Sequence, residues 1–275
     1  MTSDDAVGAT LSPTGVSRSP VKGFVAGAVV GLLGGLVGLG GAEFRLPLLL
    51  AVFGFAALAA VIVNKAMSLV VVLASIPARL TAVPISEVAH EWTAVINLLA
   101  GSLLGAWLGA SWATRMKSTT LYRVLAVLLI FIAVVFTAER IGRLPSADLP
   151  PAAQLVAGVV AGFGIGVVAA LMGVAGGELL IPTLVLLYAV DTKLAGSLSL
   201  LVSLPTMLVA FFRYSRDQAF AVLTSNKQFV LAMGAGSVTG SIAGGLLLGV
   251  VAEALLVPLL AVLLLYSALK VWRHS

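Results

Sequence analysis

Residues 35–47 read GLVGLGGAEFRLP, and residues 170–182 read ALMGVAGGELLIP. In both segments a glycine-rich run is followed by a glutamate and then by a proline. The first segment also contains Arg45, which stands among glycine and aliphatic residues. Two such segments in one chain indicate an internal duplication, and their charges are exceptions in an apolar sequence.

A single offset relates the two segments and much of the chain around them. Adding 135 to the number of Glu43 gives Glu178, and the same shift relates glycines, a serine and a proline at both ends of the unit. The matching residues are Gly23, Gly27, Gly31, Gly38, Gly41, Pro47, Gly101, Ser102, Gly105 and Gly109, with Gly158, Gly162, Gly166, Gly173, Gly176, Pro182, Gly236, Ser237, Gly240 and Gly244. The chain therefore holds two copies of one unit, about residues 21–140 and 153–273.

The composition is that of a membrane protein. Hydrophobic residues make up 60% of the chain and charged residues 10%, against about half and about a quarter in soluble domains. Runs such as 23–41 and 228–251 are long enough to cross the bilayer, which takes roughly 20 residues. Because strand-like alternation is absent, helices must satisfy the backbone. We predict an all-α polytopic membrane protein, with a disordered polar tail over residues 1–20 and a single transmembrane domain over 21–275.

Each copy opens with a stretch that is too long for one crossing. As a single helix, residues 23–63 would be about 60 Å long, roughly twice the hydrocarbon thickness of the bilayer. We therefore predict two segments joined at a glycine-rich break in each copy, forming either two crossings or a re-entrant hairpin. Three spans follow in each copy: 65–80, 92–114 and 121–138 in the first, and 195–212, 228–250 and 254–271 in the second.

Five segments per copy is an odd number, so the second copy should be inserted upside down relative to the first. Inverted repeats are typical of secondary transporters. With both termini in the cytoplasm, most basic residues, including Lys65, fall on the cytoplasmic side, as expected for membrane proteins. Loop 115–123 would then be inside and connection 140–152 outside. A rival arrangement with eight spans in parallel repeats has a similar charge bias, so segment length decides between them.

Several classes of function are disfavoured by what the sequence lacks. The net charge of +5 does not indicate nucleic acid, because the basic residues lie in short connections between apolar runs. There are no cysteines, and the two histidines are His90 in a loop and His274 in the tail. The sequence therefore offers no thiolate site, no paired metal ligands on a helix and no obvious general base. We predict neither an enzyme nor a metal or cofactor site.

The glycine motifs are candidates for an anion site. A glycine doublet followed by a charge and a proline ends one helix and starts another, which leaves backbone N–H groups and the positive end of a helix dipole free. Two such starts, related by an inverted repeat, would meet near the middle of the membrane. Arg45, whose counterpart is Leu180, adds a two-point donor for a sulfonate, sulfate or carboxylate.

The two glutamates need a separate explanation, because permanent negative charges would repel an anion. If Glu43 and Glu178 face the site, we expect them to carry protons. The alternative is that they are helix-end residues matched to the dipole, or that Glu43 forms an ion pair with Arg45.

Serines at the start of the span after each motif are further candidates, although serine in membrane helices often bonds only to its own helix. The predicted substrate site comprises Gly38, Gly40, Gly41, Glu43, Arg45, Pro47, Gly173, Gly176, Gly177, Glu178, Pro182, Ser68 and Ser197. Glycines spaced by four before these motifs, and again near Gly105 and Gly240, should instead let helices pack closely.

The two motifs, one in each half of a duplicated helical unit, resemble those of the TauE/SafE family, named as sulfite and organosulfonate exporters. The resemblance covers the chain from about Val21 to Trp272. It implies a polytopic inner-membrane protein that moves small sulfur-containing or carboxylated anions. Many members carry only small or apolar residues after the glycines, so Glu43, Arg45 and Glu178 depart from the commonest form.

Together these observations predict a secondary transporter, in the direction of export, with a passive anion channel as the alternative. The expected partners are the lipid bilayer, a small anionic substrate and protons as the coupling ion.

Overall fold

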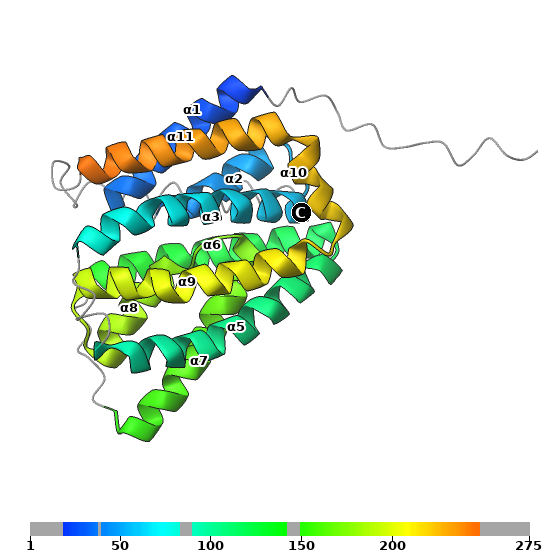
Figure 1. The fold of residues 1–275 in the computed structure, drawn as a ribbon. Helices are drawn as coiled ribbons and strands as arrows, with labels where there is room; N and C mark the ends of the chain where they lie inside the picture. Colours follow the sequence, from blue (N-terminus) through cyan, green and yellow to red (C-terminus); the bar gives the residue numbers. More distant parts are fainter. Residues whose placement is uncertain (1–18, 38–39, 83–89, 142–148, 248–275) are drawn as a thin grey trace, which may run out of the picture.

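The computed structural model describes residues 19–37, 40–82, 90–141 and 149–247. Its elements are α1 (Pro20–Val37), α2 (Ala42–Ala51), α3 (Ala57–Ala82), α5 (Trp92–Arg115), α6 (Ser118–Ile141), α7 (Pro151–Met172), α8 (Gly177–Tyr188), α9 (Thr192–Tyr214), the 3-10 turn η1 (Gln218–Ala221), α10 (Val222–Ser225) and α11 (Lys227–Leu246). No strand occurs within these ranges, and Figure 1 shows the long helices lying side by side. The all-α fold is therefore confirmed.

Six helices in the described ranges are long and apolar enough to cross a membrane: α3, α5, α6, α7, α9 and α11. Two shorter helices are also apolar. α1 precedes the glycine motif of the first copy, and α8 follows the glycine motif of the second copy. The multi-pass architecture expected from composition is thus confirmed. The predicted span 254–271 and residues 1–18 of the predicted tail lie outside the described residues, so the division into tail and transmembrane domain stays a prediction.

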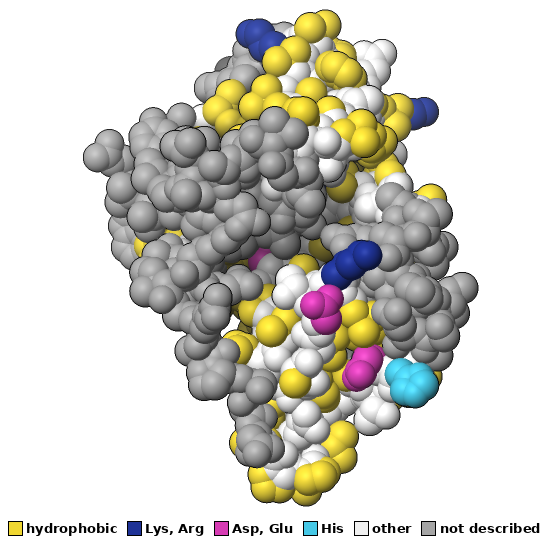
Figure 2. Space-filling model, turned by 90° about the vertical axis from the view of Figure 1, so that its left-hand side faces the viewer, with side chains coloured by type: hydrophobic (Ala, Val, Ile, Leu, Met, Phe, Trp, Pro, Cys, Tyr) yellow, Lys and Arg dark blue, Asp and Glu magenta, His cyan; other side chains and the backbone are white. Residues whose placement is uncertain are grey.

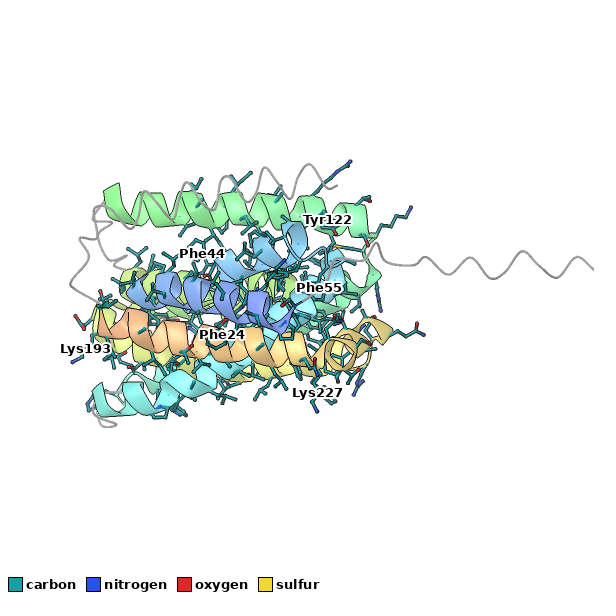
Figure 3. All side chains as sticks on the ribbon, turned by 90° about the horizontal axis from the view of Figure 1, so that it is seen from above. Phe24, Phe44, Phe55, Tyr122, Lys193 and Lys227 are labelled. Atoms are coloured by element: carbon teal, nitrogen blue, oxygen red, sulfur yellow. The ribbon has the colours of Figure 1, made fainter. Side chains whose placement is uncertain are left out.

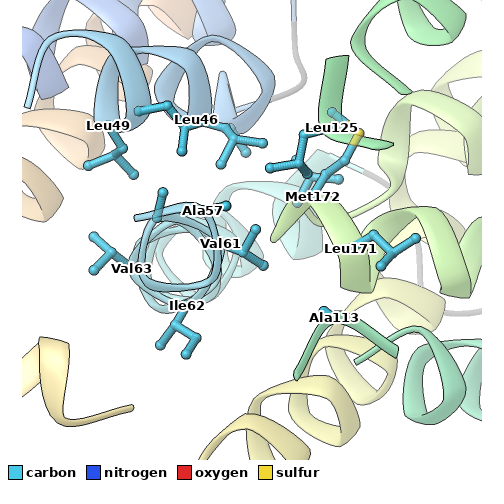
Figure 4. Packing of buried hydrophobic residues seen from close by; sticks show 14 of the residues in the cluster. Leu46, Leu49, Ala57, Val61, Ile62, Val63, Ala113, Leu125, Leu171 and Met172 are labelled. Atoms are coloured by element: carbon cyan, nitrogen blue, oxygen red, sulfur yellow. The ribbon is translucent and has the colours of Figure 1, made fainter. Parts of the chain in front are cut away.

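Helix α3 lies at the centre of the bundle. Ala57, Val61, Ile62 and Val63 leave it in different directions, and all four are completely buried. Figure 4 shows the residues around it, which are Leu46 and Leu49 of α2, Leu125 of α6 and Met172 of α7. Such an all-round apolar helix is expected inside a protein. Lys65 belongs to this helix and is completely buried, so its predicted place at the cytoplasmic start of a span is wrong.

Helices α1 and α11 touch backbone to backbone along their glycines. A Cβ atom on Gly27 would meet the carbonyl oxygen of Met233, and one on Gly35 would meet that of Ser241. Because both numbers rise together along the contact, the two helices run in the same direction. Small residues at four-residue spacing permit this approach in a membrane, as the sequence predicts.

Helices α5 and α7 form a second pair of the same kind. A Cβ atom on Gly101 would meet the carbonyl oxygen of Val159, and one on Gly109 would lie 2.9 Å from that of Val167. These helices also run in the same direction. The first helix of each copy therefore packs against a helix of the other copy: α1 packs against α11, and α7 packs against α5.

The bundle has two distinct ends, which Figure 3 marks with Lys193 and Lys227. At the Lys227 end, the Tyr122 hydroxyl donates to the carbonyl of Phe55 at 3.3 Å, and the rings of Phe55 and Phe229 lie 5.6 Å apart. Helices α3, α6 and α11 therefore all begin there. Figure 2 looks at the opposite, Lys193 end, where few of the coloured side chains are charged.

Candidate functional site

Each glycine motif lies between a longer helix and the short helix that follows it. α1 ends at Val37 and α2 begins at Ala42, whereas α7 ends at Met172 and α8 begins at Gly177. Gly40, Gly41, Gly173 and Gly176 have φ between +71° and +86°, a region that glycine adopts without steric cost. A Cβ atom on Gly41 would in addition meet the carbonyl oxygen of Val30. Glycine is thus required both by the turn and by close packing against a neighbouring helix.

Asn64 and Ser68 of α3 join the two turns. The Asn64 Nδ2 donates to the carbonyls of Ala42 and Met172, each at 3.0 Å. One side chain therefore bonds the start of α2 and the end of α7. The Ser68 Oγ donates to the carbonyl of Gly173 at 3.2 Å. The two motifs, far apart in sequence, therefore lie next to each other against the same stretch of α3.

Lys65 holds the end of α7 from the same helix. Its Nζ donates to the carbonyls of Ala169 at 2.8 Å and Val174 at 2.6 Å. A cation at a helix C-terminus interacts favourably with the helix dipole, and hydrogen bonds lower the cost of burying the ammonium. In the second copy the offset of 135 places Leu200 at this position, so this clamp is present in one half only.

Arg45 extends the polar network from α2, and its side chain is completely buried. Nε donates to Asn64 Oδ1 at 2.9 Å, and Nη2 donates to Ser68 Oγ at 2.8 Å. Among the described residues, Nη1 has no hydrogen-bond partner, and neither do the carboxylate oxygens of Glu43. The guanidinium is therefore held in place by neutral side chains rather than by a hydrogen bond to Glu43.

A cavity of about 190 Å³ lies beside Arg45. Five serines from α3, α9 and α11 line it together with Arg45: Ser68, Ser75, Ser199, Ser203 and Ser241. Its remaining described lining is small or aliphatic: Gly35, Gly40, Ala42, Val71, Val72, Ala175, Gly177, Ile181, Gly196, Leu200 and Gly245. The described lining thus holds one cation, several hydroxyls and no acidic residue, a combination that suits a small anion. Elsewhere in the described ranges no three His, Cys, Asp or Glu side chains could hold a metal ion.

Some of the predicted site residues line this cavity, and the others lie in the turns and helices around it. Gly40, Arg45, Ser68 and Gly177 line the cavity. The other described ones lie around it: Gly41, Gly173 and Gly176 in the turns, Pro47 and Pro182 inside α2 and α8, and Ser197 buried in α9. Gly38 lies outside the described residues.

Glu43 and Glu178 occupy equivalent places in the two copies. Each lies in the first turn of its helix, α2 or α8, and they are 0% and 4% exposed. None of their four carboxylate oxygens has a hydrogen-bond partner within the described part of the chain. Neither glutamate is among the residues that line the cavity, so any effect on an anion would act at a distance or through a conformational change.

Several lining serines were missed by the sequence analysis. The offset of 135 relates Ser68 to Ser203, and Ser203 lines the cavity. The repeat itself could therefore have identified Ser203, whereas position at the start of a span pointed to Ser197. Ser75 and Ser241 correspond to Ala210 and Ala106, so the duplication carries no signal for them.

A family model described as sulfite exporter TauE/SafE matches residues 23–271. This range includes both glycine turns and every described residue that lines the cavity. Searches among curated proteins and among solved structures found no match.

Proposed function

The chain belongs to the TauE/SafE sulfite exporter family, and on that premise we propose that it is a secondary transporter, working as an exporter, of small anions across the cytoplasmic membrane. Sulfite, organosulfonates and related carboxylates are the substrate classes that fit. The observation that carries the proposal is Arg45, whose buried guanidinium lines a cavity without acidic residues in its described lining.

The surroundings of Arg45 explain why an anion would bind. Charges inside a membrane protein are costly and are usually paired, yet the hydrogen-bond partners of Arg45 are the neutral side chains of Asn64 and Ser68. An anion in the cavity would balance this charge and accept hydrogen bonds from the lining serines. The planar guanidinium suits the paired oxygens of a sulfonate or carboxylate.

Glu43 gives this site a route to proton coupling. It lies two residues before Arg45 in α2, and both side chains are buried, so that the two charges would interact through a medium of low dielectric. An ionised Glu43 and a bound anion therefore compete to balance the same guanidinium. Binding of the anion should favour the protonated form of Glu43, and by linkage protonation should favour binding of the anion.

Proteoliposomes loaded with unlabelled sulfonate test the transporter proposal. A carrier should take up labelled sulfonate by counterflow, whereas a channel should only equilibrate it. Transport should fall as pH rises if ionised glutamates oppose the anion. In Glu43→Gln and Glu178→Gln this dependence should be lost, because the amide keeps the size of the side chain but does not titrate. Absence of counterflow would contradict the carrier, and an unchanged pH profile in both variants would contradict proton coupling.

The proposed topology has two inverted repeats with both termini in the cytoplasm. It is supported by the parallel pairs α1 with α11 and α5 with α7, because α1 begins at the Lys227 end and α7 at the Lys193 end. Basic residues near the Lys227 end fit a cytoplasmic location; they are Lys22, Arg115, Lys117, Arg123, Arg213, Arg216 and Lys227.

Cysteine labelling tests this topology in a chain that has no cysteine of its own. Ser118→Cys, at the start of α6, should react with a membrane-impermeant reagent only from the cytoplasmic side. Ser146→Cys, in the connection outside the described residues, should react only from the opposite side. Labelling of both from the same side would rule out the inverted arrangement.

A further inference from the structure

A second cavity, between α3 and α11, adjoins the anion cavity. This outer cavity has a volume of about 340 Å³. It shares four lining residues with the inner cavity: Val71, Ser75, Ser241 and Gly245. The described residues that line the outer cavity alone are Ala74, Val238, Ile242 and Leu246. The two cavities therefore adjoin each other, and the outer one lies farther along α3 and α11, toward the Lys193 end where both helices finish.

The two parts of this space differ in chemistry. The inner part contains the guanidinium of Arg45 and five serine hydroxyls, whereas every described residue that lines only the outer part is apolar. An inorganic anion such as sulfite would occupy the inner part and leave the apolar walls without a partner. A molecule with a charged head and an apolar tail would match both parts at once.

We propose that the transported anion is amphiphilic, with its charged head at Arg45 and a short alkyl tail between α3 and α11. This inference rests on the proposed function, because the head is placed by the same anion site. The tail would lie against Val71 and Ala74 of α3 and Val238 and Ile242 of α11. Burial of methylene groups on these walls would then add to the affinity that the head supplies.

Gly245 marks the passage between the two cavities. It lines both of them, and a Cβ atom placed there would have no described atom within 4 Å. Its neighbour Gly244 is different, since a Cβ atom there would meet the carbonyl oxygen of Leu32. One glycine of the pair thus serves helix packing, whereas the other leaves space where the tail would pass.

A homologous series of sulfonates measures the contribution of the tail. Binding of methane-, propane- and pentanesulfonate to the protein in lipid nanodiscs should tighten by up to about fourfold per added methylene, which corresponds to about 0.8 kcal/mol for each one buried. The polar analogue 3-aminopropanesulfonate should bind more weakly than propanesulfonate. Equal affinity across the series would overturn the amphiphilic substrate but leave the anion site standing. If no sulfonate binds, the proposed function itself fails.

Two variants test whether the alkyl tail lies in the outer cavity. Gly245→Leu should fill the space where the two cavities meet and remove the gain in affinity with chain length. The matched control is Gly164→Leu in α7, where a Cβ atom also has no described atom within 4 Å. Gly164 lines neither of the two cavities, so this variant should behave as the parent does. Ile242→Ser should weaken binding of pentanesulfonate more than that of methanesulfonate. An undiminished gain with chain length in both cavity variants would show that the tail lies elsewhere.

Discussion

Replacing Arg45 with leucine should reduce anion transport by about a hundredfold, as expected when about 3 kcal/mol is lost with one partner of a buried charge pair. The guanidinium is the cation that lines the described cavity, and leucine already occupies the equivalent position 180 in the second copy. Arg45→Lys should keep the charge but still bind more weakly than the parent. A lysine cannot bond Asn64 and Ser68 and also present a planar pair of donors to the anion.

Folding must be followed in the same experiment. Arg45→Leu removes the donor to Asn64 Oδ1, and a buried polar group left without a partner costs about 1–3 kcal/mol, so we expect Arg45→Leu to insert and fold but to unfold at a lower temperature than the parent. Binding isotherms for methanesulfonate then separate loss of the site from loss of the fold. If folded Arg45→Leu transports as well as the parent does, Arg45 serves only to hold Asn64 and Ser68, and backbone groups alone would have to bind the anion.

A single methyl group on Gly162 should destabilise the protein by about 1–3 kcal/mol, the range found for overpacked interiors. A Cβ atom there would meet the carbonyl oxygen of Leu98 in α5. The obstacle is backbone, so the two helices must move apart to relieve it. Gly162→Leu should prevent α5 and α7 from pairing, and we expect no folded protein from that variant.

Gly164 supplies a control in the same helix. A Cβ atom at this position would have no described atom within 4 Å, and alanine is a better helix former than glycine by about 1 kcal/mol. Gly164→Ala should therefore unfold at the same temperature as the parent or at a higher one. The comparison is made by thermal or denaturant unfolding of the two alanine variants in the same lipid or detergent. Equal stability of both would contradict the close approach of α5 and α7.

The helices and their pairing could be largely predicted from the sequence, because both depend on local patterns. Apolar run length sets the spans, and four-residue glycine spacing predicts surfaces where backbones touch. Lys65 shows where such patterns fail. An ionised lysine in an apolar run looks like the edge of a span, since it is costly in lipid. The carbonyls of Ala169 and Val174 that lower this cost lie more than a hundred positions away, and no local signal announces them.

The residues of the candidate site could be predicted only where an isolated charge or the duplication marks them. Arg45 stood out as a charge among aliphatic residues, and the turn glycines were marked by their repetition. The cavity also depends on which faces of α3, α9 and α11 meet, and that is decided by packing. Ser75 and Ser241 look like ordinary serines of apolar helices, and their counterparts are alanines, so neither periodicity nor repetition distinguishes them.

The packing of α1 against α11, which belongs to the other copy, has a consequence for biosynthesis. The glycine face of α1 is synthesised before that of its partner α11, and every other described helix is synthesised between the two. Contacts between such distant parts of a chain form late in folding. Ser241 and Gly245 of α11 also complete the cavity. A chain translated only as far as α9 therefore lacks one wall of this cavity, and the cavity is completed only when α11 has been inserted.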